Sequence, residues 1–415
     1  MHPNERYTFL VTVFRSPLFV AVAIRVVSRY IATNPISTTS VFSSNREENM
    51  RRTFCVSVLL LMAVSIFDTA AALPRFASRT GAKCQSCHIN PSGGGMRQVF
   101  GVQYGRDELP VPTWSEEFGL DDFSTKLSDF VSIGADFRTL FFYQEKTEAN
   151  AFFQMQGNIY TNFRIAKKVN MYLSKGLYSG FEVFGLLNIL PADGFVKVGK
   201  FIPNYGLKMD DHRFFIRQET GFSPERGRAE LAGGEIGLSP GHVTVTGGLY
   251  NSSEIGSTPT GNRNKALLGK VEGILPLEGG VNIGLGGNVF TRRNIQDLRT
   301  TVFGGYGSFS FKNITVLAEG DFIRNTGPGA TKDSTGVVMF VECDYVVTPG
   351  LDLKVAFDYF DPDKDLKSGS VSRFSFGFEF FPITGVEVRP IYRVVDNKKA
   401  TFEANEFDLL VHFYF

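Results

Sequence analysis

The sequence predicts an all-β fold, a transmembrane antiparallel β-barrel of about 16 strands that follows a small N-terminal segment. Apolar and polar residues alternate with period two from about residue 130 to the end of the chain. The segments between these runs are short turns and longer polar loops in alternation. No stretch after residue 73 is apolar and long enough to be a spanning helix, so membrane insertion would require a closed barrel.

The alternation is clearest near the C-terminus. Residues 351–359 place Leu, Leu, Val, Phe and Tyr on one face of a strand, and Asp, Lys, Ala and Asp on the other. Residues 373–380 repeat the pattern with four phenylalanines. The chain has 41 phenylalanines, and their recurrence at alternate positions is more than one β-sandwich core would bury. Strands with an apolar outer face and a polar inner face are typical of outer-membrane barrels.

An even strand number places both ends of a bacterial barrel in the periplasm. The last strand ends in Phe415, which resembles the C-terminal signal of proteins folded by the barrel-assembly machinery. The strands are expected near 130–143, 152–165, 169–177, 181–190, 195–204, 228–239, 243–251, 266–276, 280–291, 298–311, 314–324, 336–347, 351–360, 370–381, 385–395 and 406–415.

Residues 50–72 have the three parts of a signal peptide, so export is expected. A basic start at Met50–Arg52 is followed by the apolar run Val56–Phe67 and by the small residues Ala70–Ala72. Residues 1–49 are interpreted as a non-structural upstream extension from a misassigned start codon, with a membrane anchor as the alternative.

Cys84, Cys87 and His88 form a C-x-x-C-H motif. This spacing places two thiols one helical turn apart, facing one porphyrin edge, with the histidine as proximal iron ligand. A zinc site would need a second pair of cysteine or histidine ligands, and a thioredoxin-like site would need a βαβ pattern. The sequence has neither. The motif therefore predicts one covalent haem c in a monohaem cytochrome segment at 73–128, ahead of the barrel at 129–415.

The second axial ligand of the haem iron stays open among a few residues. His212 is the first candidate because it lies in the loop 204–228, at the third-loop position that folds into the lumen of many porins. Met96 is the second candidate, since a methionine ligand raises the reduction potential. His412 points into the predicted lumen near the periplasmic rim, and His242 falls in a short turn.

Several lumen-facing carboxylates are placed to attract a cation such as ferrous iron, although basic residues on the same strands are available to balance them. The carboxylates are Glu319, Asp321, Glu342, Asp344, Asp352 and Asp358, and the basic residues are Lys354, Arg373, Arg389 and Arg393.

The order of leader, single haem motif and porin-like remainder resembles the fused monohaem cytochrome–porins. The shared residues are Arg75-Phe76-Ala77, Thr80-Gly81, the Cys84–His88 motif and Phe100-Gly101. The resemblance implies electron transfer across the outer membrane, and members from iron-oxidising bacteria oxidise Fe(II) at the cell surface. The chain departs from the family at residues 89–97, where Gly93–Gly95 form either a close approach to the porphyrin or a flexible turn.

The expected function is therefore that of a haem c-containing protein of the Gram-negative outer membrane, with Fe(II) as candidate extracellular donor and a periplasmic electron carrier as acceptor. The alternatives are a diffusion porin with a haem plug or sensor, and a haem peroxidase. The 43 basic and 42 acidic residues are nearly balanced, which gives no indication of nucleic-acid binding.

Overall fold

The computed structural model describes residues 74–118, 124–177, 180–223, 229–252, 264–294, 296–397 and 404–415. The predicted signal peptide and upstream extension lie outside the described residues. Within these ranges, no helix combines the length and the apolar character needed to cross a membrane.

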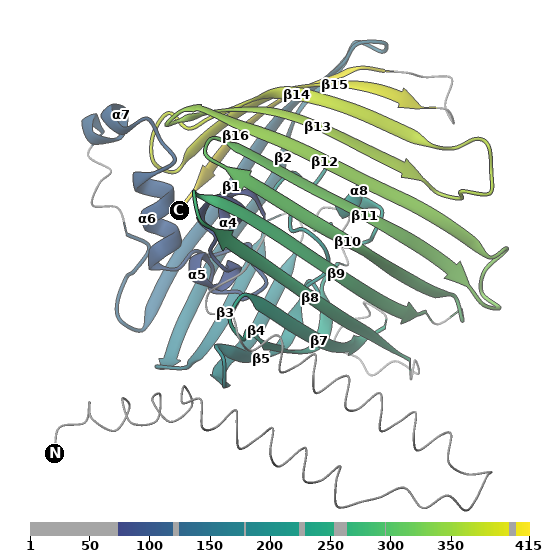
Figure 1. Cartoon of the computed structure of the whole chain (residues 1–415), viewed down its shortest axis with the longest axis horizontal. Coiled ribbons are helices and arrows are strands. Elements are labelled where there is room, and N and C mark those ends of the chain that lie inside the picture. The colour runs from purple at the N-terminus through teal and green to yellow at the C-terminus, as the bar shows by residue number, and fades with distance from the viewer. Residues whose placement is uncertain are drawn as a thin grey trace, which may run out of the picture. The chain divides into compact units, whose positions relative to one another are not determined.

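Sixteen antiparallel strands form a closed barrel, in which each strand pairs with its neighbours in the sequence and β1 pairs with β16 (Figure 1). The predicted fold class is confirmed. The strands are β1 (Val131–Gln144), β2 (Ala149–Ala166), β3 (Val169–Gly176), β4 (Phe181–Leu190), β5 (Gly194–Phe201), β6 (Leu231–Leu238), β7 (Val243–Asn251), β8 (Lys265–Leu277), β9 (Val281–Arg293), β10 (Arg299–Phe311), β11 (Ile314–Thr326), β12 (Ser334–Thr348), β13 (Leu351–Asp361), β14 (Val371–Phe380), β15 (Val386–Asn397) and β16 (Glu406–Tyr414).

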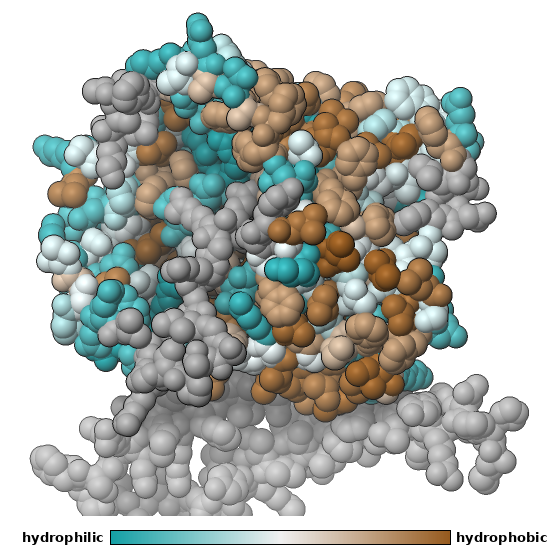
Figure 2. All heavy atoms as spheres, turned by 180° about the vertical axis from the view of Figure 1, so that it is seen from behind, coloured by the Kyte–Doolittle hydropathy of each residue, from teal (hydrophilic) through white to brown (hydrophobic). Residues whose placement is uncertain are grey.

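The outer wall of the barrel is apolar, as the period-two pattern predicts. On β14 the side chains of Phe374, Phe376 and Phe378 are 40–47% exposed, whereas those of Ser375 and Glu379, on the other face of the strand, are buried. Figure 2 shows apolar side chains spread over the outer wall of the barrel. An exposed apolar belt of this kind faces lipid, because contact with water would be unfavourable.

The barrel has a short-turn end and a long-loop end. Turns such as 312–313 and 349–350 join strands at the first, and segments such as 252–264 and 362–370 join them at the second. The two strands that flank the segment 202–230 are shorter than expected at that end, since β5 stops at Phe201 and β6 starts at Leu231. The chain between them turns inward.

The segment 202–230, the third loop at the long-loop end, folds into the lumen as predicted. The Tyr205 hydroxyl donates to the Asp321 carboxylate at 2.7 Å, and the Leu207 backbone N–H donates to Glu319 at 2.8 Å. Its short helix α8 (Phe215–Gln218) packs against β11, β12 and β13. The loop is thereby bonded to the inner wall of the barrel.

Between residues 74 and 118 the chain forms four short helices ahead of the barrel, and α4 (Arg75–Thr80) lies inside the lumen against β9, β10 and β11. The Ser78 hydroxyl donates to Ser308 at 3.0 Å, and the Arg79 guanidinium binds the Asp352 carboxylate at 2.7 Å. These partners lie near the short turns, so the segment fills the lumen from that end. The helices are α4 (Arg75–Thr80), α5 (Cys84–Cys87), α6 (Val99–Asp107) and α7 (Pro112–Glu117).

The two sides of the lumen differ in chemistry. Inward-facing positions of β2 to β5 carry rings, and Tyr160, Tyr172, Phe184 and Phe201 contact one another in sequence with centroids 4.8–6.4 Å apart. Inward-facing positions of β12 to β16 carry mainly charged groups instead. The prediction of a polar lumen is therefore confirmed for the side of β12 to β16. On the side of β2 to β5 the rings form a hydrophobic core with the third loop, and buried polar groups such as Asn162, Ser174 and Lys197 lie among them.

Candidate functional site

The C-x-x-C-H motif forms a single helical turn inside the barrel. Cys84 and Cys87 begin and end α5, and His88 caps it in an extended conformation. Both cysteines and His88 line one cavity of about 280 Å³. Burial raises the pKa of the Cys84 thiol to about 12, so this cysteine stays protonated.

The imidazole of His88 is oriented by the loop that follows it. Its Nδ1 lies 3.3 Å from the Gly95 carbonyl oxygen, and because a carbonyl only accepts, Nδ1 carries the proton. The Nε2 lone pair is then available to a metal, which is the usual arrangement for ligating histidines. Burial and the nearby Arg97 guanidinium lower the pKa of His88 to about 4, so the ring is neutral.

The three-glycine run after the motif has a fixed conformation that requires glycine. Gly93, Gly94 and Gly95 have φ values of 81°, 75° and 64°, which side chains disfavour. A Cβ on Gly93 would stand 3.2 Å from the Cys84 sulfur. Gly94 lines the cavity, and the position of its missing Cβ has no atom within 4 Å. This geometry explains why glycine is required at these positions and leaves the backbone open to the cavity at Gly94.

His212 of the third loop lines the same cavity as His88. Its side chain is buried, and the loop that carries it is bonded to the barrel wall through Asp210 and Asp211 before it and through Arg213 after it. The structure thus brings the motif and the first candidate for the second axial ligand to one cavity, although more than 120 residues separate them. Met209 lines the cavity too, and its thioether was not singled out from the sequence.

The other candidate ligands lie elsewhere. Met96 is 1% exposed and packs in the ring-rich core, and it is not among the residues that line the cavity. The His412 ring lies 2.8 Å from Glu387 and 3.1 Å from Asp136. The His242 Nδ1 donates to the Ile274 carbonyl at the short-turn end.

Two cationic side chains that line the cavity form no ion pair with a carboxylate within 4.0 Å among the described residues. Arg217 is 5% exposed, and its Nε has no hydrogen-bond partner among the described residues. Lys208 donates to the Ser92 hydroxyl at 3.0 Å and to the Gly93 carbonyl at 3.4 Å, both neutral groups. Burial lowers the pKa of Arg217 to about 10. Burial and the nearby Lys197 ammonium lower the pKa of Lys208 to about 8. Buried positive charges of this kind would be stabilised by an anionic ligand.

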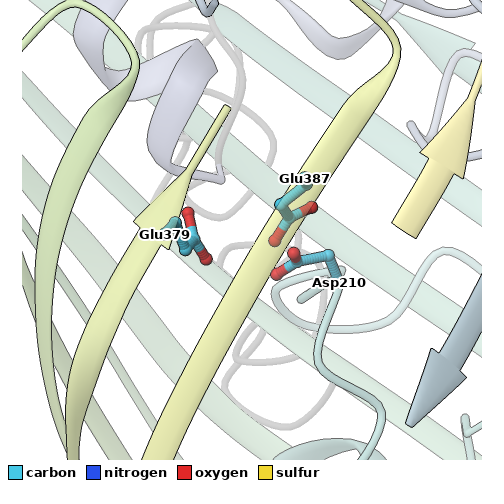
Figure 3. Close-up of side chains that lie close together, drawn as sticks. All are labelled: Asp210, Glu379 and Glu387. Atoms are coloured by element: carbon cyan, nitrogen blue, oxygen red, sulfur yellow. The ribbon is translucent and has the colours of Figure 1, made fainter. Parts of the chain in front are cut away.

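Most of the buried carboxylates of the lumen are paired with basic groups, and Glu319 and Asp321 are bonded instead to the Leu207 N–H and the Tyr205 hydroxyl of the third loop. Asp210, Glu379 and Glu387 point toward one another (Figure 3), with oxygens within 4.8 Å. Arg389 lies 2.9 Å from Asp210, 3.1 Å from Glu379 and 3.5 Å from Glu387, so this cluster is an ion-pair network. Lys354 pairs in the same way with three carboxylates. Of the two interpretations of the lumen carboxylates, charge balance is therefore the one that the structure favours.

The fold is similar to solved outer-membrane porins, whereas neither a protein-family model nor a curated protein matches the sequence. OmpT of Vibrio cholerae matches with a TM-score of 0.53 and 13% identity over 70% of this chain and all of that protein. The anion-selective porin of Comamonas acidovorans matches with a TM-score of 0.53 and 10% identity over 69% of this chain and 99% of that one.

These similarities and the apolar belt agree with the predicted location. The chain forms a porin-like barrel whose apolar belt faces lipid.

Proposed function

We propose that this chain is a haem c protein that carries electrons across the outer membrane. The observation that carries the proposal is the shared cavity inside the barrel, lined by Cys84, Cys87 and His88 from one end of the lumen and by His212 from the other. The apolar belt surrounds this cavity with lipid, so electrons transferred through it would pass from one side of the membrane to the other.

The residues of the cavity fit a haem c. The two thiols stand one turn apart for its vinyl groups, and His88 Nε2 has a free lone pair for the iron. His212 stands as second iron ligand, and the surplus cations Lys208 and Arg217 match the two carboxylates that a haem carries. When bound, the haem would supply a one-electron iron couple, whose potential depends on the axial ligands.

The lumen contents favour electron transfer over solute diffusion. Helix α4 is bonded to strands near the short turns, and the third loop is bonded to the wall from the other side. The resemblance to cytochrome–porins makes Fe(II) the first extracellular donor to test, with a periplasmic electron carrier as acceptor.

The first test is covalent haem. The protein is purified from outer membranes and run on a denaturing gel stained for haem peroxidase activity. We expect a stained band that disappears in Cys84→Ser and persists in Cys343→Ser, because Cys343 is exposed on the outer wall. An unstained wild-type band would overturn the proposal.

The second test separates the three functions. Fe(II) is added to the oxidised protein while the haem α-band is monitored, and reduction of a low-spin haem is the expected result. High-spin iron with peroxide turnover would instead support a peroxidase. Rapid solute flux through vesicles that carry the protein would support a diffusion porin.

A further inference from the structure

The segment 111–118 carries the single tryptophan of the chain on the outside of the barrel rim. Its helix α7 leaves Trp114 46% exposed and Phe118 64% exposed. These two side chains are four residues apart and therefore lie on the same side of the helix. Glu116, two residues after Trp114, lies on the opposite side and is exposed. The segment thus has one aromatic side and one charged side.

The segment is hydrogen-bonded to the β14–β15 turn and packs against the β12–β13 turn at the short-turn end. The Val111 backbone N–H donates to the Phe381 carbonyl at 3.0 Å, and the Thr384 N–H donates to the Ser115 hydroxyl at 3.1 Å. A Cβ on Gly350 would stand 2.5 Å from a methyl group of Val111, so the β12–β13 turn also contacts the segment closely. These contacts hold α7 in a defined place on the rim.

The aromatic side of α7 continues the lipid-facing belt. The Trp114 ring meets the Phe380 ring edge-on, with centroids 5.8 Å apart and planes at 88°. Phe380 ends β14 in phase with Phe374, Phe376 and Phe378, whose side chains face lipid. Trp114 therefore stands beside the last lipid-facing residue of this strand, at the level where a barrel meets the headgroup layer.

We propose that the segment 111–118 is an interfacial anchor, bound to the phospholipid of the leaflet at the short-turn end through Trp114 and Phe118. Tryptophan suits this place because its ring is apolar and its indole N–H needs a polar partner. The anchor has a consequence for the site. The preceding helix α6 packs on α5 so closely that a Cβ on Gly101 would stand 2.3 Å from the Cys87 carbonyl oxygen. Lipid contact at α7 would therefore add a membrane attachment to the chain segment that carries the C-x-x-C-H motif.

The native protein is its own probe, because tryptophan fluorescence comes from Trp114 alone. The full-length protein is reconstituted into phosphatidylcholine vesicles, either plain or with bromine near the headgroup, at mid-chain or at the chain end. We expect blue-shifted emission, with the strongest loss of fluorescence for bromine near the headgroup. Each result is the ratio of intensities in brominated and plain vesicles. Energy transfer to a bound haem weakens all three ratios in the same direction, so their order still reports the depth.

Two variants calibrate the depth. The first is a double variant, Trp114→Phe and Phe376→Trp, whose single tryptophan lies in the middle of the belt. Mid-chain or chain-end bromine should quench it most. The second is a double variant, Trp114→Phe and Leu366→Trp, whose single tryptophan lies in the long loop 362–370. Leu366 is 54% exposed there, so aqueous acrylamide should quench this tryptophan. Native emission that matches the Leu366→Trp variant would overturn the proposal. Native emission protected from both bromine and acrylamide would overturn it too, because a protein partner would then cover the segment.

Discussion

Replacement of Arg75 by methionine should release the N-terminal segment from the lumen. Arg75 is 5% exposed, and its guanidinium forms an ion pair with Glu379 and lies 4.0 Å from Asp344. Both carboxylates are fully buried. Arg75→Met keeps most of the side-chain volume but removes the charge that these carboxylates face.

The free-energy cost of this substitution follows from the burial of the Arg75–Glu379 ion pair. Loss of one partner of a buried ion pair costs about 3–5 kcal/mol, because the remaining charge stays buried. At 1.4 kcal/mol per factor of ten, the detached population would rise roughly 100- to 4,000-fold. Glu379 also lies 3.3 Å from Lys354 and 3.1 Å from Arg389, so these two cations still compensate part of the Glu379 charge in the variant. We therefore expect a cost near the lower end, about 3 kcal/mol.

Limited proteolysis of the folded protein in detergent measures this population, since cleavage of a rapidly opening segment follows its opening equilibrium. Cleavage within 74–118 should accelerate while the barrel stays resistant. Arg106→Met is the matched control, because the Arg106–Asp107 pair is partly exposed and surface pairs contribute about 0–1 kcal/mol. Equal cleavage rates in the two variants would refute the argument. The effect of Arg75→Met should also shrink in a Glu379→Gln background.

Three further predictions concern the cavity. His212→Ala should convert a low-spin haem spectrum to high-spin, whereas His242→Ala should not; unchanged spectra in both would exclude His212 as ligand. Gly95→Ala should lower the thermal stability by roughly 1–3 kcal/mol, because its Cβ would stand 2.2 Å from the Tyr172 hydroxyl at a φ of 64°. Tyr172→Phe should restore part of that loss, and its failure to do so would argue against this contact. Because burial lowers the pKa of Lys208 to about 8, the haem-free protein should gain stability against urea as pH rises from 8 toward about 10.4, the value of an unfolded lysine. Lys208→Met should flatten this dependence, and an identical slope in the variant would contradict the assignment.

Local patterns in the sequence were sufficient to predict the barrel wall. Period-two alternation and turn residues depend on neighbours in the chain, so the expected strand over 243–251 coincides with β7 and that over 351–360 differs from β13 by one residue. The helical turn at Cys84–Cys87 was likewise predicted from the spacing of neighbouring residues. The inward course of the third loop was predicted from its position in the strand order, and the structure confirms it.

The sequence by itself thus determined the strand count, the lipid-facing side of each strand and the C-x-x-C-H turn, because each is encoded over a few consecutive residues. Only the tertiary structure decided which side chains share the lumen. Arg217 and His212 reach the cavity by way of a loop, and Tyr172 and Phe184 stack across neighbouring strands. Closure of the barrel creates these contacts between residues far apart in the chain, and no local pattern encodes them.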